Sequence, residues 1–258
     1  MIGLVLSGLD GSGDNSMKKL VKFIISIWVC LFFIDLKADA IQENITSCGA
    51  GNSDGCVELA NLYYEGNGVK HSYSKAQAYY RKACDAGNGR GCVNLGDFYK
   101  DGINQKLDYF KANTYYAKAC VAGNSDGCYK LGTLYDYDNG NRIKQDYSKA
   151  RSYYSKACDA GNGLGCSHLG FLYKKGNGVK QDNVKARSYF TKACNVGNGF
   201  GCTSLGILYF NGEGIKKDDL KARAYYAKAC NANNAAGCFN LGIVNDQLKK
   251  PSDIVSKQ

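Results

Sequence analysis

Cysteines recur along this chain in pairs at a nearly constant interval. The two members of a pair lie eight positions apart, in the spacing C-x7-C. The pairs are Cys48 with Cys56, Cys84 with Cys92, Cys120 with Cys128, Cys158 with Cys166, Cys194 with Cys202, and Cys230 with Cys238. Successive pairs begin 36, 36, 38, 36 and 36 residues apart, and the single 38 reflects a two-residue insertion near residues 136–141. A fixed period of this length predicts an array of repeated supersecondary units.

A first helical pattern, which we name helix A, starts at the second cysteine of each pair. A leucine comes three positions later, a small residue follows it, and a tyrosine comes seven positions after the cysteine in five copies. These spacings place cysteine, leucine and tyrosine on one buried face of a helix. The leucines are Leu59, Leu95, Leu131, Leu169, Leu205 and Leu241, and the small residues are Ala60, Gly96, Gly132, Gly170, Gly206 and Gly242. The small residue lets a neighbouring helix approach closely.

A second pattern, helix B, reads K-A-x-x-Y-Y-x-K-A-C and leads into the next cysteine pair. Glycine-rich turns precede it, and a residue that can cap a helix N-terminus stands before it in each copy. These capping residues are Ser72, Asp108, Asp146, Asp182 and Asp218. No single A–B unit can bury its apolar face, so the units must stack. The sequence therefore predicts an all-α, right-handed α/α solenoid cross-linked through its cysteines.

The pattern also predicts the organisation of the chain. Five full repeats occupy residues 55–236, after a truncated N-terminal cap over 41–54. A last helix A over 237–250 caps the array, with Asn245 in place of tyrosine as suits an end that faces water, and a tail follows over 251–258. The tyrosine pairs of helix B are predicted to lie mostly in the core rather than to form a platform for nucleic-acid bases.

The N-terminal region has the three parts of a secretory signal peptide. A basic stretch begins at Met17, an apolar run covers 23–34, and Ala38-Asp39-Ala40 is an A-x-A cleavage site. A membrane anchor is the alternative, but the apolar run falls short of the roughly 20 residues that a spanning helix needs. We expect a signal peptide over 17–40, cleavage near Ala40, and a secreted or periplasmic protein. Residues 1–16 are expected to precede the true start at Met17.

Disulfide bonds explain the paired cysteines better than metal ligation does. Cleavage removes Cys30 and leaves an even number of cysteines in an oxidising compartment. The period makes pairing within each C-x7-C the economical solution. Zinc sites favour closer C-x2-4-C spacings, so no metal is expected.

Several motifs resemble those of the Sel1-like repeat, a relative of the tetratricopeptide repeat. They are L-G-x-x-Y, K-A-x-x-Y-Y-x-K-A and G-x-G-V-K, as in Gly66–Lys70 and Gly176–Lys180. The second repeat departs from the pattern, because Asn104 and Gln105 replace glycine and valine, although asparagine tolerates left-handed geometry. With its C-x7-C pairs and signal peptide, the chain is similar to the Helicobacter cysteine-rich proteins. That resemblance implies a penicillin-binding protein with weak β-lactamase activity, and also a secreted antigen that engages host cells.

The residues themselves supply no recognisable catalytic site. Ser72-Tyr73-Ser74-Lys75 fits the S-x-x-K of serine β-lactamases, but the accompanying S-D-N and K-T-G elements are absent. Ser72 is better explained as the cap of helix B. The two histidines, His71 and His168, are far apart in the sequence, and neither a phosphate loop nor a cofactor motif is present. No cofactor is expected, and a hydrolytic activity would rest on the family resemblance alone.

A curved surface is the feature that the repeat does offer. In Sel1-like arrays the A helices are expected to line the concave face, where positions two and five after the cysteine vary between repeats. From the central repeats we predict that ligand contacts come from Asn94, Asp97, Lys130, Thr133 and His168. Variation at these positions is also what an unconstrained surface would show, so a solvated face without a partner stays open.

The partner class follows from charge and compartment. The net charge of +10 favours anionic partners such as envelope polymers, acidic host proteins or a penicillin carboxylate, and nucleic acid is not expected outside the cell. The alternative to β-lactam chemistry is a non-catalytic, monomeric module that binds a peptide or host protein.

Overall fold

The structure, a computed structural model, describes residues 19, 22–26, 39–137 and 143–249 of the chain. Residues 1–16, most of the expected signal peptide and the tail over 251–258 lie outside this described part. The described residues beyond residue 38 form a tandem array of paired helices, so the predicted all-α repeat fold is confirmed. No helix among them is long and apolar enough to cross a membrane.

Two kinds of helix alternate, as the sequence pattern predicts. The A helices are α2 (Ser53–Glu65), α4 (Gly89–Asp101), α6 (Ser125–Asp136), α8 (Gly163–Lys175), α10 (Gly199–Asn211) and α12 (Ala235–Lys249). The B helices are α3 (Tyr73–Asp85), α5 (Tyr109–Val121), α7 (Tyr147–Asp159), α9 (Asn183–Asn195) and α11 (Asp219–Asn231). A further helix over 39–49 takes the place of a B helix before α2.

The start of each helix is set by a side chain that accepts hydrogen bonds from the first turn. The predicted caps of the B helices are confirmed: Ser72 Oγ accepts from the backbone NH of Lys75 at 3.3 Å, and the four aspartates act likewise. The caps of the A helices were not among the predicted features. In the first five A helices they are asparagines of the Gly-Asn turns, Asn52, Asn88, Asn124, Asn162 and Asn198. At α12, Asn234 Oδ1 accepts in the same way from the backbone NH of Gly237. The same short turn therefore ends one helix and starts the next.

The turn within a repeat requires left-handed backbone at two positions, and at one of them the second repeat has asparagine in place of glycine. Gly68 has φ 74° in the first repeat, and Asn104 has φ 58° at the equivalent position of the second. Asparagine is one of the few residues that enters this region readily. The second repeat therefore keeps the left-handed turn despite its changed sequence.

Close packing inside a repeat depends on the small residue beside each leucine of helix A. An added Cβ at Gly132 would lie 2.6 Å from the ring of Tyr154, and one at Gly170 would lie 2.6 Å from the ring of Phe190. The same contact exists at Gly96 and Gly206, where the rings belong to Tyr116 and Tyr226. Each of these four A helices thus seats an aromatic ring of its helix B directly against its backbone. The expectation that the small residue permits close approach is confirmed.

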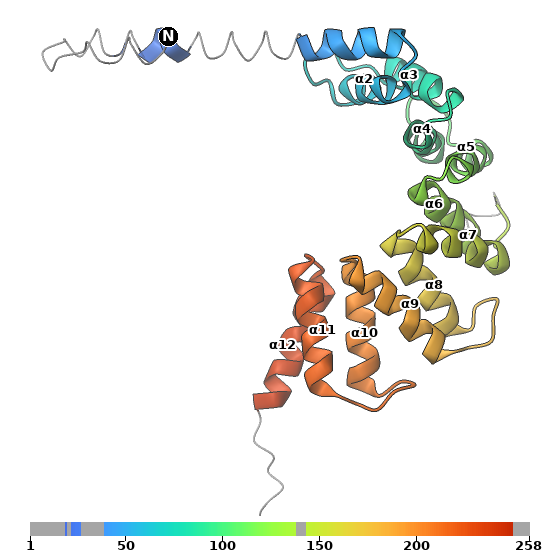
Figure 1. Cartoon of the computed structure of the whole chain (residues 1–258), viewed down its shortest axis with the longest axis vertical. Helices are drawn as coiled ribbons and strands as arrows, with labels where there is room; N and C mark the ends of the chain where they lie inside the picture. The colour runs from blue at the N-terminus through green and yellow to red at the C-terminus, as the bar shows by residue number, and fades with distance from the viewer. Residues whose placement is uncertain (1–18, 20–21, 27–38, 138–142, 250–258) are drawn as a thin grey trace, which may run out of the picture.

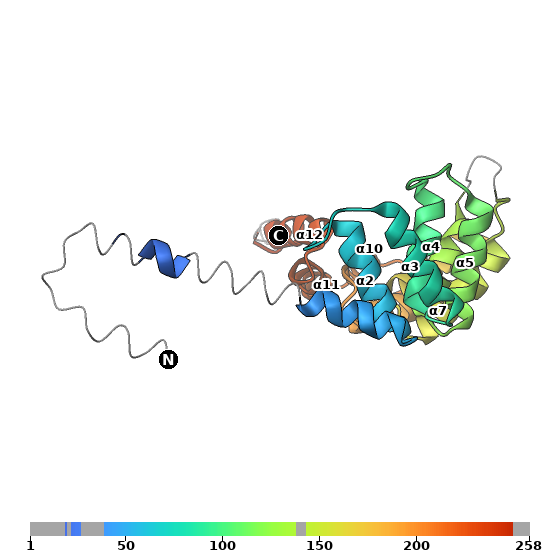
Figure 2. The same ribbon diagram turned by 90° about the horizontal axis from the view of Figure 1, so that it is seen from above.

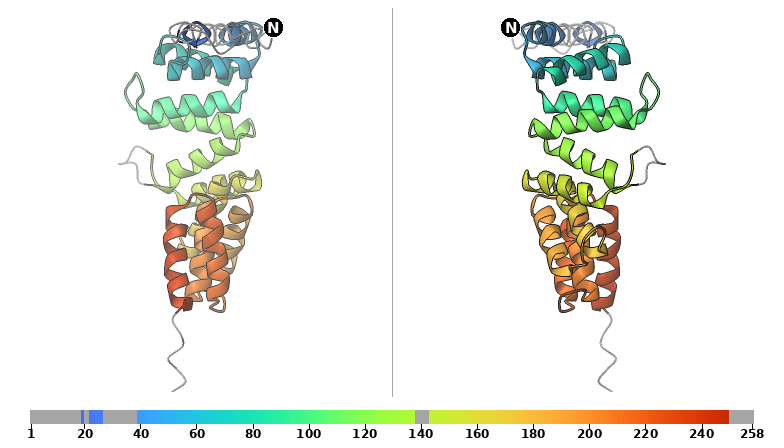
Figure 3. Two further views of the ribbon diagram at one scale, coloured as in Figure 1. Left: turned by 90° about the vertical axis from the view of Figure 1, so that its left-hand side faces the viewer. Right: turned by 90° about the vertical axis from the view of Figure 1, so that its right-hand side faces the viewer.

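The stack of repeats bends into an arc (Figure 1). Helices α4 and α6 lie on its inner side, and α5 and α7 lie on its outer side. Successive A helices contact each other, whereas successive B helices of the described chain do not do so to the same extent. Figure 2 shows α4 and α5 side by side from above, and Figure 3 shows that the last helices stand upright where the first lie across the view. The array therefore twists as well as curves, and its A helices line the concave face.

Six disulfides join neighbouring repeats, and the pairing predicted within each C-x7-C is present in every case. The bonds link Cys48 to Cys56, Cys84 to Cys92, Cys120 to Cys128, Cys158 to Cys166, Cys194 to Cys202, and Cys230 to Cys238. The Cα atoms of each pair are 4.4 to 4.6 Å apart. Each bond connects the end of a B helix, or of helix 39–49, to the start of the next A helix. The cross-links therefore run between repeats rather than within them.

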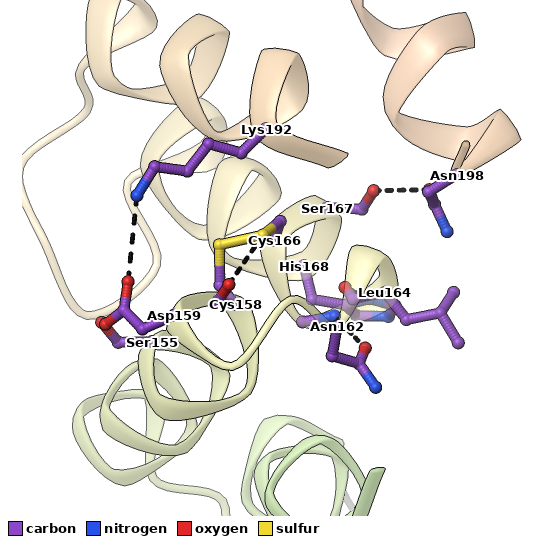
Figure 4. The surroundings of a disulfide bond; sticks show 11 residues. Ser155, Cys158, Asp159, Asn162, Leu164, Cys166, Ser167, His168, Lys192 and Asn198 are labelled. Atoms are coloured by element: carbon purple, nitrogen blue, oxygen red, sulfur yellow. Dashed lines mark hydrogen bonds and ion pairs between the residues drawn. A yellow bond between two sulfur atoms is a disulfide. The ribbon is translucent and has the colours of Figure 1, made fainter. Parts of the chain in front are cut away.

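The surroundings of the disulfides are similar along the array until its last member. Figure 4 shows the Cys158–Cys166 bridge, beside which Lys192 of α9 lies 3.8 Å from Asp159. The sulfur atoms of Cys128 and Cys202 lie 3.7 Å from the backbone carbonyl oxygens of their partner cysteines, and both residues are buried. Cys238 is exposed instead, since no repeat follows α12 within the described part of the chain to cover it.

Candidate ligand-binding groove

The five residues predicted to contact a ligand all lie on A helices of the concave face. Asn94 and Asp97 belong to α4, Lys130 and Thr133 to α6, and His168 to α8, and all five are half-buried. In the fifth repeat, Ser204 stands at the position of His168 and is buried, with 6% of its surface exposed. The polar surface of the groove is therefore concentrated on the first to fourth repeats.

Three of the predicted residues form one connected group. Lys130 Nζ lies 3.1 and 3.2 Å from the two carboxylate oxygens of Asp97, and the Tyr116 hydroxyl donates to Asp97 Oδ1 at 2.5 Å. Thr133 Oγ1 donates to the backbone carbonyl of Lys130 at 2.7 Å. An anion that bound Lys130 would have to compete with Asp97. Burial, followed by the nearby Asp97 charge, raises the pKa of Tyr116 and keeps its hydroxyl protonated as a donor.

A buried or half-buried tyrosine hydroxyl of helix B reaches a groove acceptor in each of the first three repeats. Tyr80 donates to Asn61 Oδ1 at 2.5 Å, and Tyr154 donates to Asp136 Oδ2 at 2.9 Å. In the third repeat the short Thr133 occupies the position of Asn61, and the acceptor is Asp136, one turn further along α6. Burial raises the pKa of Asp136, although the Tyr154 hydroxyl and His168 act in the opposite direction.

The end of α6 differs from the ends of the other A helices that are followed by a B helix. Helices α2, α4, α8 and α10 end on a left-handed glycine, whereas α6 ends on Tyr137 in extended conformation. Aspartate stands at the glycine position here, next to the two-residue insertion. The changed ending places Tyr137 and Asp136 on the wall of a pocket between α6 and α8.

This pocket has a volume of about 650 Å³ and opens between α6 and α8. Its wall includes five aromatic side chains, Tyr129, Tyr137, Tyr147, Phe171 and Phe200, together with Leu164, His168, Asp136 and Lys175. We name it the aromatic pocket. The rings of Tyr137, Phe171 and Phe200 are 55%, 38% and 56% exposed. Large rings left open to solvent around a hollow indicate a binding surface.

His168 is the one predicted contact residue in the aromatic pocket. Its Nδ1 donates to the backbone carbonyl of Leu164 at 3.0 Å, because a carbonyl can only accept. Its Nε2 lies 3.5 Å from the Tyr137 hydroxyl, and its ring packs against Tyr129 and Tyr154 at centroid distances of 5.2 and 5.1 Å. His168 therefore connects the wall of the pocket to the core.

The other residues of the pocket are absent from the sequence-based prediction, although the sequence carries one signal for them. Three positions of helix A that are polar in most repeats carry aromatic or apolar residues around this pocket. Phe171 stands where other repeats have asparagine, aspartate, threonine or isoleucine, and Phe200 and Leu164 stand where the first three have aspartate or arginine. Tyr137 replaces glutamate, aspartate, lysine or asparagine. A comparison of the repeats for such departures would have predicted the site.

The candidate catalytic residues occupy structural positions. Ser72 caps α3, and His71 packs its ring edge-on against Tyr73 at a centroid distance of 4.3 Å. His71 and His168 lie in different repeats. Within the described ranges, no group of histidine, cysteine, aspartate and glutamate side chains has the arrangement of a metal site.

Five segments of the chain match the Sel1 repeat family, at residues 53–88, 89–124, 125–162, 164–198 and 200–234. No curated protein sequence matches the chain. Among solved structures, it is similar to a Sel1 repeat protein from Oxalobacter formigenes, with 27% identity and a TM-score of 0.71 over 83% of this chain and 94% of that one. The fold is also that of immunity protein Pa5087 from Pseudomonas aeruginosa, with 21% identity and a TM-score of 0.52 over 76% and 75% of the two chains.

A third similarity concerns half of the chain. Cysteine rich protein B of Helicobacter pylori is 34% identical over 51% of this chain and 93% of that one, with a TM-score of 0.42. The assignment of the chain to a family rests on the matched repeats, which together cover well over half of the sequence. With its paired helices, left-handed glycine turns and five matched segments, the chain belongs to the Sel1 repeat family.

Proposed function

We propose that this protein is a non-catalytic interaction module that acts outside the cytoplasm and holds a peptide or protein segment in its concave groove. Six disulfides support an oxidising compartment, since such bonds are reduced in most cytosols. Secretion or export to the periplasm accords with the signal peptide expected over residues 17–40. Stacked repeats of this kind create extended concave surfaces that suit elongated ligands.

The observation that carries the proposal is the aromatic pocket in the middle of this groove. It combines exposed rings with a few polar groups, as sites for specific binding do. On the side toward the N-terminus, Asp97 and Lys130 offer a polar surface whose charges already compensate each other. A ligand that follows the groove would therefore meet a neutral polar stretch and an apolar anchor point in succession.

Substitutions in the groove should weaken binding of the first peptide or muropeptide ligand that array screening identifies. Lys130→Glu puts a second carboxylate opposite Asp97, and Asn94→Ala removes an amide from the neighbouring repeat. We expect the two substitutions together to lower the affinity for this ligand about tenfold, as the loss of a well-placed charged contact does. The measurement is calorimetric titration of the mature protein.

Lys185→Glu on α9 is the control, because its ammonium group is well exposed and packs over the Tyr173 ring at 5.4 Å. It should leave affinity unchanged. The groove assignment is wrong if Lys130→Glu and Asn94→Ala leave affinity unchanged while substitutions on the B helices abolish binding.

Protein purified from a host without β-lactamases should not hydrolyse a chromogenic cephalosporin, and fluorescent penicillin should not label it. The reason is that Ser72, the serine of the S-x-x-K motif, is committed to capping α3 through its 3.3 Å contact with the backbone of Lys75. The Ser72→Ala variant and heat-denatured protein are the controls. Turnover that exceeds both controls and falls in groove variants would contradict the non-catalytic assignment and favour a penicillin-binding function.

A further inference from the structure

The aromatic pocket has a chemical character that narrows its ligand, provided that the proposed groove binding holds. Its charged wall residues are Asp136 on α6 and Lys175 on α8, within the part of the chain that the structure describes. Asp136 is half-buried at the end of its helix, whereas Lys175 is exposed. The pocket therefore presents a partly desolvated carboxylate among aromatic rings, with a cation that is free to move away into solvent.

We propose that the aromatic pocket takes the basic side chain of an arginine or lysine in the bound peptide, with its charge at Asp136 and its stem between Tyr137, Phe171 and Phe200. The faces of tyrosine and phenylalanine rings attract cations, and the attraction grows as water is excluded. An apolar side chain would cover Asp136 without compensating its charge, which is costly. An acidic side chain would face a carboxylate in a partly buried place.

The tyrosine contact of Asp136 makes a clean variant possible. Tyr154 donates to Asp136 Oδ2, and in the first repeat Tyr80 donates in the same way to Asn61. Asp136→Asn therefore keeps an acceptor for Tyr154 and removes only the charge. Phe171→Asn likewise introduces the residue that the first repeat has at this position, while removing a ring that packs against Phe190 at 5.1 Å.

The test is a titration of the isotope-labelled mature protein with capped nonapeptides that differ at one central residue: arginine, lysine, glutamine, phenylalanine or glutamate. Saturable shifts of the amide signals of residues 164–171 report binding. We expect the arginine and lysine peptides to bind about tenfold more tightly than the glutamine peptide. Asp136→Asn should remove this preference, and Phe171→Asn should weaken binding of both basic peptides about threefold.

Lys175→Ala gives the sharpest check, because the direction of the change in affinity depends on the charge of the peptide. It should strengthen binding of a basic peptide, whereas it would weaken binding of an acidic one. The matched controls are Asp101→Asn, at the end of α4, and Ile207→Asn, at the position of Phe171 in the next repeat. Both should leave the affinities for the peptides unchanged. Circular dichroism shows whether each variant is folded.

Several outcomes would overturn the proposal. They are equal or tighter binding of the phenylalanine or glutamate peptide, no effect of Asp136→Asn, or no shift with the basic peptides up to about 10 mM, a concentration that reveals even weak contacts. If a groove ligand still depends on Lys130 and Asn94 in those cases, the proposed function survives and only the pocket assignment fails. If that dependence is lost too, the interaction module itself is wrong.

Discussion

Complete reduction of the six disulfides should unfold the array at temperatures where the oxidised protein is stable. Each bridge closes a short C-x7-C loop, and the chain-entropy relation assigns about 2.5 kcal/mol to a loop of this length. Six such loops contribute about 15 kcal/mol at most, which is as large as the whole stability of an ordinary domain, about 5–15 kcal/mol. Thermal melting followed by circular dichroism, with and without reductant, measures the loss.

The order of reduction provides an internal control. Cys230–Cys238 should react first because Cys238 is exposed, and Cys48–Cys56 should react late because each of its cysteines is only 1% exposed. Thiol titration of the denatured, unreduced mature protein should find no free thiol. Several free thiols, bound zinc, or an unchanged melting curve after full reduction would show that the bridges do not support the fold.

Replacing Gly170 by valine should be among the most damaging single changes in the protein. A Cβ at this position would lie 2.6 Å from the ring of Phe190, so a branched side chain must push α9 away from α8. Overpacking of this kind lowers the free energy of unfolding by about 3 kcal/mol. This loss exceeds the gain of less than ~1 kcal/mol from removing a helical glycine. Denaturant unfolding with the disulfides intact gives the free-energy difference.

Gly242→Val is the matched control, because Gly242 has the same place in α12 but has no atom within 4 Å of an added Cβ. Among the described residues, no aromatic ring of a B helix lies against Gly242. The substitution should change stability little, or increase it slightly through helix propensity. Equal destabilisation by the two substitutions would mean that the ring contact does not hold the repeats together.

Much of the fold can be predicted from the sequence because each repeat contains the residues that define its own helices. Cysteine, leucine and tyrosine spacings define the buried face of helix A, and Asp108 or Ser72 marks the start of a B helix. The cross-links follow from the period. These features depend on residues close together in the chain, and the same sequence pattern recurs in five repeats.

The candidate site was harder to predict because it is assembled from side chains of different repeats. Nothing in the sequence shows that Lys130 spans from α6 to Asp97 on α4, so that its charge is compensated. Nor does the pattern around the insertion show that α6 ends early and places Tyr137 beside His168. Phe200 reaches the pocket from α10. Distances between repeats, and not local periodicity, decide these contacts.

Because the disulfides run between repeats, proteolytic cuts in the two kinds of turn have different consequences. The peptide bond after Arg90, in the first turn of α4, lies inside the loop closed by Cys84 and Cys92, so cleavage there leaves the two parts covalently joined. The bond after Lys180 lies between α8 and α9, outside all six loops, and cleavage there leaves only non-covalent contacts between the parts. Proteases that cut between repeats would thus leave the array in one piece, whereas those that cut within a repeat would divide it into shorter arrays.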